Sequence, residues 1–261
     1  MRKNTALTLI LILTVIATLA WGINTAQGQH AVTEGLVSYW SFDKNAVTGN
    51  TVEDVWGDND GSIIGPKIVK GKVGEALEFD GKDDYVLVEH GGSLTFGSGD
   101  FSVDLLANPI TMGTYTGLIT TDIAGDSAWK IFRDVPGGGG YFRARYGSTQ
   151  SDYPAVSAGE WHHYGYVKSG TTLTLYLDGS SVVSDACPAT HSLVGSELAF
   201  GSYRIQNAKD SLHMYNGLID ETRIYERALS KAEISQNYNY VAAVSPSGKL
   251  TTTWADLKGA P

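Results

Sequence analysis

The 261-residue sequence contains one cysteine, Cys187, so it can form neither an intrachain disulfide nor a cysteine-based zinc site. It is also short of positive charge, with 19 Lys and Arg against 28 Asp and Glu and a formal net charge of −9. Nucleic-acid binding requires a basic patch, so this balance argues against it. Beyond Gly28 no apolar run is long enough to span a bilayer. What remains is an acidic chain whose hydrophobic fraction, 42%, is sufficient for a packed core.

The N-terminal segment has the pattern of a signal peptide. Two basic residues precede an apolar run from Ala6 to Trp21, which is short for a membrane helix and typical of a signal-peptide core. The small residues of Ala26-Gln27-Gly28 predict cleavage after Gly28, with Ala20 or Ala26 as other possible sites. An uncleaved anchor is the alternative. We therefore expect residues 1–28 to be removed from an exported protein, either secreted or at the cell surface.

The rest of the chain reads as short strands separated by tight turns. Its strongest hairpin signal is the pair Leu173–Leu177 and Ser181–Val183 around the turn Asp178-Gly179. Ser230-Lys-Ala-Glu233 matches a capping box and predicts a helix of two to three turns. Many short strands, Gly-rich turns and one helix favour an all-β sandwich. Residues 241–261 are less patterned and are interpreted as a C-terminal tail, in which Leu250–Trp254 could form one added strand.

Several motifs, in their order along the chain, carry a family resemblance. They are Gly35–Asp43, Trp56–Gly61, Lys72–Val86, Phe101–Ala107, Glu160–Tyr164, Leu173–Gly179 and Gly217–Ser230. Together they resemble the laminin-G-like jelly-roll domains of the concanavalin A-like lectin/glucanase superfamily, with Leu106 where that family often has Trp. The resemblance implies a two-sheet antiparallel jelly-roll sandwich over residues 29–240, with one short C-terminal helix.

Lectins, adhesion modules, glucanases and structural spacers all use this fold, so function depends on site residues. Related glucanases imply two carboxylates at alternate positions of one strand, because retaining hydrolysis needs them about 5–5.5 Å apart. Asp220 and Glu221 are adjacent and are predicted to point to opposite faces, while Asp104 is expected to stand alone among apolar residues. We therefore expect a non-catalytic binding or adhesion module. A glucanase-type hydrolase and a ligand-free spacer are the alternatives.

Other reactive side chains in the sequence point to structural roles. His162 and His163 are adjacent in a predicted strand and project to opposite faces, so they cannot grip one metal together. No Gly-x-Ser-x-Gly elbow is present. Cys187 is interpreted as a small buried hydrophobe or a free thiol.

The resemblance also implies a structural calcium where the two ends of the domain meet. Its ligands, carried over by motif, are Asp43, the carbonyl of Gly81 and Asp220. Calcium prefers carboxylate and carbonyl oxygens, which turns supply. The alternative is that aspartates such as Asp80 and Asp83 form turn hydrogen bonds, and both interpretations remain open.

A polar face is predicted on the segment 141–146. Its alternate residues fall into an apolar set, expected in the core, and a Tyr-Arg-Arg set, expected at the surface. Sugar recognition combines aromatic platforms with hydrogen-bond donors, so the second set predicts binding of carbohydrate or of an extracellular protein ligand. The predicted ligand-binding residues are Trp129, Tyr141, Arg143, Arg145 and Tyr153. The alternative is that Trp129 packs in the core and the arginines pair with surface acids.

Overall fold

The computed structural model describes residues 30–121, 129–133, 140–190, 195–204 and 213–243. The predicted strand Leu250–Trp254 and the predicted signal peptide lie outside these residues. The chain divides into two compact units, Met1–His30 and Ala31–Pro261. His30 is the only described residue of the first unit, so the fold below is that of the second.

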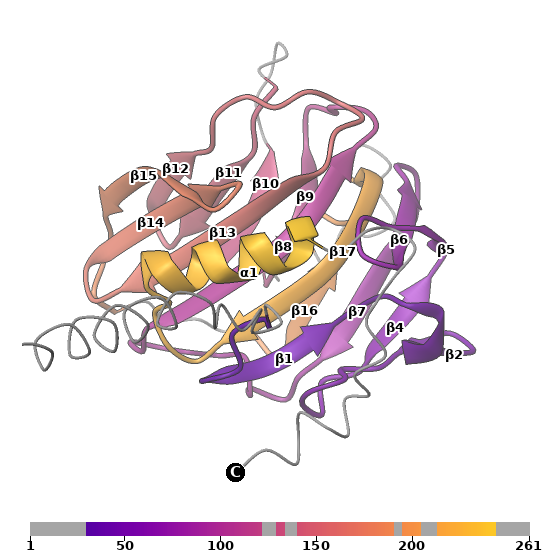
Figure 1. The fold of residues 1–261 in the computed structure, drawn as a ribbon, viewed down its shortest axis with the longest axis horizontal. Coiled ribbons are helices and arrows are strands. Elements are labelled where there is room, and N and C mark those ends of the chain that lie inside the picture. Colours follow the sequence, from indigo (N-terminus) through magenta and orange to yellow (C-terminus); the bar gives the residue numbers. More distant parts are fainter. Residues whose placement is uncertain (1–29, 122–128, 134–139, 191–194, 205–212, 244–261) are drawn as a thin grey trace, which may run out of the picture. The chain divides into compact units, whose positions relative to one another are not determined.

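Two antiparallel sheets form the domain (Figure 1). Sheet A, in spatial order, consists of β15 (Ser180–Ala186), β14 (Thr172–Leu177), β13 (His162–Ser169), β8 (Phe101–Pro109), β17 (Asn216–Tyr225), β6 (Glu75–Asp80) and β5 (Lys67–Lys70), and β1 (Leu36–Trp40) pairs with one end of β17. Sheet B consists of β12 (Thr149–Asp152), β11 (Arg143–Tyr146), β10 (Trp129–Arg133), β9 (Thr116–Thr120), β16 (Glu197–Phe200), β7 (Tyr85–Glu89), β4 (Gly61–Ile64), β3 (Thr51–Val52) and β2 (Val47–Thr48). A short 3₁₀ turn, η1 (Lys44–Ala46), follows β1. The prediction of a two-sheet sandwich is confirmed.

The core lies between the sheets and is rich in aromatic rings. Trp40 and Phe200 meet edge to face with ring centroids 5.2 Å apart, which joins β1 of sheet A to β16 of sheet B. Phe101 on β8 stacks on Tyr166 of β13 and tilts against Trp129 of sheet B. Offset and edge-to-face pairs add to the area that such rings bury. Cys187 is buried in the same core, as expected, and burial raises the pKa of its thiol.

The predicted central hairpin is present as β14 and β15. Asp178 and Gly179 occupy the connecting turn with φ angles of 49° and 75°. Asp and Gly tolerate this left-handed conformation better than other residues, and the turn they form matches the twist of the two strands. The turn therefore aligns the strand residues next to it, Leu177 with Ser180, and the register shifts by one residue between Tyr176 and Leu175.

One helix, α1 (Lys231–Ala243), lies across the outer face of sheet A (Figure 1). Its N-terminus is the predicted capping box: the Glu233 carboxylate accepts from the Ser230 backbone N–H at 2.7 Å, and the Ser230 hydroxyl accepts from the Glu233 N–H at 3.3 Å. The helix has 13 residues and continues into the segment predicted as tail. Ile234 and Val241 anchor its buried side, and this packing accounts for the extra length.

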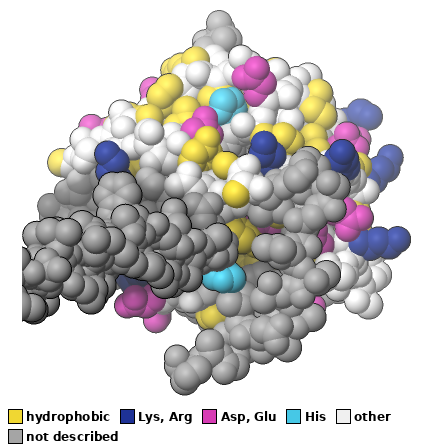
Figure 2. Space-filling model, in the orientation of Figure 1, with side chains coloured by type: hydrophobic (Ala, Val, Ile, Leu, Met, Phe, Trp, Pro, Cys, Tyr) yellow, Lys and Arg dark blue, Asp and Glu magenta, His cyan; other side chains and the backbone are white. Residues whose placement is uncertain are grey.

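The side of the molecule that α1 covers carries both signs of charge. Figure 2 shows acidic and basic side chains interspersed along the edge near β5 and β6. Among the described residues, no helix is long and apolar enough to cross a membrane.

Candidate binding site

The predicted polar face lies on the outer side of sheet B. Arg143 and Arg145 on β11 are half-buried and alternate with the buried Ala144 and Tyr146. Tyr141, also half-buried, precedes the strand in the same alternation. The guanidinium of Arg143 binds both oxygens of Asp152 on β12, at 2.5 and 3.2 Å, and donates to Gln150 at 3.1 Å. This part of the face was predicted from the alternation of residues 141–146.

The other two residues predicted to bind ligand, Trp129 and Tyr153, lie in the core, so the prediction is wrong for both. Trp129 is fully buried because it pairs with Tyr146, and cross-strand partners share a face. Tyr153 is also buried, and its hydroxyl donates to the Gly165 carbonyl at 3.0 Å. Neither ring can present a platform to a ligand at the surface. The alternative interpretation of Trp129 as a core residue is the one that the structure confirms.

Strand β10 adds residues that sequence reasoning missed. Lys130 pairs with Arg145, and Phe132 pairs with Arg143, so both lie on the polar face. The ammonium of Lys130 sits 3.8 Å from the centre of the Tyr203 ring and 4.4 Å from that of Phe132. The alternation in Trp-Lys-Ile-Phe could have identified Lys130 as a residue of the polar face. It places Lys130 on the other face of the strand from the apolar Trp129 and Ile131.

Three rings from distant segments meet beside these residues, and we call them the aromatic corner: Tyr115, Tyr203 and His213. Their centroids are 5.3 to 5.7 Å apart in each pair. Tyr203 is buried at the centre and contacts Phe132 edge to face at 5.4 Å. Tyr115 is 37% exposed. The corner therefore extends the polar face of β10 and β11 toward the start of β9.

Glycine and arginine position the corner. Gly117 on β9 has no side chain, and a Cβ there would collide with the backbone carbonyl of Ser202. Its absence lets the chain carrying Tyr203 pass directly over β9. Arg133 is buried and donates from Nη1 to the carbonyls of Met112, at 2.8 Å, and Gly113. These bonds hold the loop that presents Tyr115.

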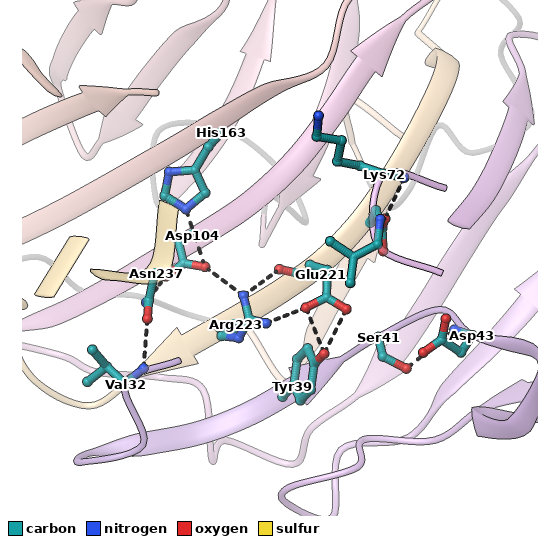
Figure 3. Close-up of polar contacts among 12 residues, drawn as sticks. Val32, Tyr39, Ser41, Asp43, Lys72, Asp104, His163, Glu221, Arg223 and Asn237 are labelled. Carbon is teal, nitrogen blue, oxygen red and sulfur yellow. Dashed lines mark hydrogen bonds and ion pairs between the residues drawn. The ribbon is translucent and has the colours of Figure 1, made fainter. Parts of the chain in front are cut away.

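A second polar group, the buried carboxylate cluster of Asp104, Asp220 and Glu221, lies beneath α1, from which Asn237 contacts Asp104. Figure 3 shows Arg223 between Asp104 and Glu221. Asp220 pairs with Leu106 and Arg223 pairs with Asp104, so β17 has one residue more than β8 between these pairs. Glu221, with φ of 51°, is the extra residue of this β-bulge. The bulge places Asp220 and Glu221 on the same face. The predictions that they point apart, and that Asp104 stands alone, are therefore wrong.

The carboxylates of the cluster have their partners within the fold. Arg223 binds the Glu221 carboxylate and lies 3.5 Å from Asp104, while Tyr39 donates to Glu221 at 2.8 Å. Burial and the charge of Glu221 raise the pKa of Asp220 well above its ordinary value. Burial also acts to raise the pKa of Asp104, but His163 and Arg223 hold it below its usual range. All three acids are at most 1% exposed, so a substrate cannot reach them in this arrangement.

The two histidines have structural partners. His162 Nδ1 lies 2.8 Å from the Asp178 carboxylate at the hairpin turn. His163 is buried, with Nε2 at 3.7 Å from Asp104. Their separation onto different faces agrees with the expectation from adjacent strand positions.

The three predicted calcium ligands do not form one site. Asp43 and Asp220 accept hydrogen bonds from opposite ends of one turn: Asp43 from the Glu75 N–H at 2.9 Å, and Asp220 from the Lys72 and Val73 N–H groups at 3.1 and 3.0 Å. Gly81 instead lies against Asn216, four residues from Asp220 along β17, which is about 13 Å in a strand. The prediction that Gly81 and Asp220 bind the same calcium ion is therefore wrong. Calcium binding itself stays a prediction.

Asp80, Asp83 and Asp84 form an acidic group between β6 and β7, with ligand oxygens within 4.8 Å of one another. Asp84 accepts from the Asp80 N–H at 2.9 Å, and Asp80 accepts from the Lys82 N–H at 2.9 Å. Asp80 therefore makes the turn hydrogen bond of the alternative interpretation, and Asp84 makes a second one.

With the fold described, comparison with known proteins places the chain in a family. A model of the concanavalin A-like lectin/glucanases superfamily matches residues 80–235, and the chain belongs to this superfamily. No curated protein matches the sequence.

Solved structures share the fold at low sequence identity. Domain 4 of AbnA, a GH43 extracellular arabinanase from Geobacillus stearothermophilus solved with arabinotriose, is 21% identical; the match covers 78% of this chain and 98% of that one, with a TM-score of 0.60. Trypanosoma rangeli sialidase in complex with sialic acid is 17% identical over 82% of this chain and 34% of the sialidase, with a TM-score of 0.64. The binding domain of Paraclostridial Mosquitocidal Protein 1 is 16% identical over 79% of this chain and 52% of that one, with a TM-score of 0.59. The chain thus spans about a third of the sialidase and about half of the toxin's binding domain.

Proposed function

We propose that this protein is an exported, non-catalytic carbohydrate-binding module that uses the outer face of sheet B. The observation that carries the proposal is the row of Tyr141, Arg143 and Arg145 beside the aromatic corner. Such a row offers fixed donors for sugar hydroxyls and rings for their apolar faces. The AbnA domain, which shares the fold, was solved with arabinotriose and adds support.

The absence of catalysis rests on the carboxylate cluster. Asp104, Asp220 and Glu221 share a face, as a retaining hydrolase would require, but they are sealed beneath α1 and engaged by Arg223 and Tyr39. Hydrolysis also needs access for both sugar and water. We therefore expect no turnover in a screen of polysaccharide substrates. Turnover that Glu221→Gln abolishes would favour a hydrolase instead.

A glycan array followed by calorimetry tests the binding proposal. We expect at least one glycan to bind, and Arg145→Ala to weaken it by about tenfold, the loss typical of one charge-assisted hydrogen bond. Lys82→Ala is the control for the loss of one positive charge, because Lys82 is exposed and lies in the turn between β6 and β7. If no glycan binds, or if both variants behave alike, the proposed site is wrong.

A further inference from the structure

The aromatic corner has a feature that the core does not explain: Tyr115 presents a ring at the surface. Its exposed fraction is 37%, while Tyr203 behind it is 7% exposed. Tyr203 and His213 both meet Tyr115 at steep angles, 70° and 80°, with centroids 5.7 and 5.5 Å away. In a T-shaped pair the edge of one ring meets the face of the other. Two neighbours thus fix the orientation of an exposed ring.

The loop that carries Tyr115 is held as well as the ring. Arg133 binds the Met112 and Gly113 carbonyls, and the Ile110 N–H donates to the Asn216 carbonyl at 2.9 Å. The opposite side of the corner is closed by backbone bonds, since the Tyr203 N–H donates to His213 at 2.9 Å and Ser202 pairs with Met214. A ring that is already fixed loses little entropy when a ligand stacks on it. A binding platform benefits from this preorganisation. A surface tyrosine that binds nothing would not need its ring to be held in place.

The corner lies on the same face of sheet B as the site proposed above, with the buried side chains of Phe132 and Tyr203 between them. Across the sheet, Arg143 on β11 pairs with Phe132 on β10, and Phe132 pairs with Gly117 on β9, over which Tyr203 lies. Tyr115 directly precedes β9. Neighbouring strands are about 4.8 Å apart, so the backbones at Arg143 and Gly117 are separated by about 10 Å, or two strand spacings, and Arg145 lies farther along its strand. That separation exceeds the reach of one sugar ring and suits adjoining units of a chain.

We infer that the aromatic corner is a second sugar-binding subsite, in which Tyr115 stacks on a sugar ring of an oligosaccharide whose other units contact Arg143 and Arg145. The inference rests on the proposed function and adds the ligand class: an oligosaccharide long enough to span both groups, in place of a monosaccharide. Tyr115 supplies the apolar platform, His213 lies beside it, and the guanidinium of Arg204 lies 5.3 Å from the centre of the neighbouring Tyr203 ring. Tyr203 and Arg133 are positioning residues.

Chain length separates this inference from the proposed function. The probes are arabino-oligosaccharides of one to six units, together with a matched length series of any other glycan that the array identifies. We expect wild-type affinity to rise over the first units and then level off. Tyr115→Ala should lose about tenfold in affinity for the longest oligosaccharide and change little for the shortest one that binds, because one stacked ring contributes an energy of this order. Tyr115→Phe should retain the affinity, since it keeps the ring.

Ile110→Ala is the matched control, because Ile110 is an equally exposed apolar residue of the same loop, at 45%. If affinity does not depend on length, or if Tyr115→Ala weakens short and long oligosaccharides alike, the second subsite is absent while carbohydrate binding stands. If wild type binds no glycan in any series, the proposed function fails and the subsite with it. A concentration-dependent dimer in sedimentation that Tyr115→Ala dissociates would assign the corner to self-association and overturn the inference.

Discussion

Asn237 is the side chain at which the two ends of the domain meet. Its Oδ1 accepts from the Val32 N–H at 2.7 Å, while its Nδ2 donates to Asp104 at 2.5 Å and to the Tyr225 hydroxyl at 2.9 Å. It is fully buried on α1. A single amide therefore joins the start of the domain, the carboxylate cluster and the helix. Each of its partners is buried and would be left without this bond if the amide were removed.

We predict that Asn237→Ala lowers the free energy of unfolding by about 2–3 kcal/mol, because a buried carboxylate and a buried N–H each lose a partner. Urea denaturation measures the change. Asn239→Ala, an exposed change on the same helix, should stay within about 0.5 kcal/mol of wild type. Equal effects of the two substitutions would show that the amide has no special role.

At the scale of elements, α1 depends on its first turn. Two hydrogen bonds from Arg227 and others from Ser230 lower the pKa of Glu233 from 4.5 to about 2. Because the folded value lies below the unfolded one, this stabilisation is complete above about pH 4.5 and is lost as the pH falls toward 2. The capping box is thus a source of acid sensitivity.

Glu233→Gln should therefore cost about 0.5–1 kcal/mol near pH 7, because Gln can keep the capping bond but loses the ion pair with Arg227, and the cost should shrink as the pH falls. Stability curves of both proteins between pH 7 and about pH 2.5 should converge at the acid end. Curves that stay parallel would show that the carboxylate charge contributes nothing to the helix.

Elements whose local chemistry determines them could be predicted from the sequence. The hairpin of β14 and β15 depends on Asp178-Gly179, and the start of α1 depends on Ser230 and Glu233, all of them short-range signals. Pairing between distant strands left no such signal. The sequence leaves Trp129 open between a ligand-binding and a core position because it does not show the register with Tyr146, and the bulge at Glu221 breaks the alternation from which faces are predicted.

The residues of the candidate site divide in the same way, into those that local sequence predicts and those that depend on pairing between distant segments. Arg143 and Arg145 follow from alternation within one strand, whereas the aromatic corner joins Tyr115, before β9, to Tyr203 and His213, between β16 and β17. Its assembly depends on Gly117, which in the sequence is one of 31 glycines and is marked by nothing local. Sites built across strands therefore required the structure.

At the scale of the whole molecule, the proposed export changes the charge of the protein. The second compact unit begins at Ala31, and its first described hydrogen bond to the sheet and helix is that of Val32. The mature chain would be more acidic, since Arg2 and Lys3 are lost.

That acidity is the context for the calcium prediction. With a net charge of −9 before export, carboxylates near one another favour a bound cation. Extracellular calcium sites commonly have Kd values of about 10⁻⁴–10⁻³ M, so roughly 2 mM free calcium would add about 0.6–1.8 kcal/mol to stability. For a domain of this size we expect chelation to lower Tm by about 1–7 °C and leave the protein folded.

Two variants locate such a site if thermal unfolding responds to chelator. Asp220→Asn should abolish the response if the cation lies beside the turn that Asp43 and Asp220 flank, because the Asp220 Oδ1 makes no hydrogen bond among the described residues and remains open for a ligand. Asp80→Asn should abolish it if the acidic turn between β6 and β7 holds the ion. Asp185→Asn, on the exposed strand β15, should leave the response intact. A wild-type Tm that chelator does not move would mean that these aspartates act through turn hydrogen bonds alone.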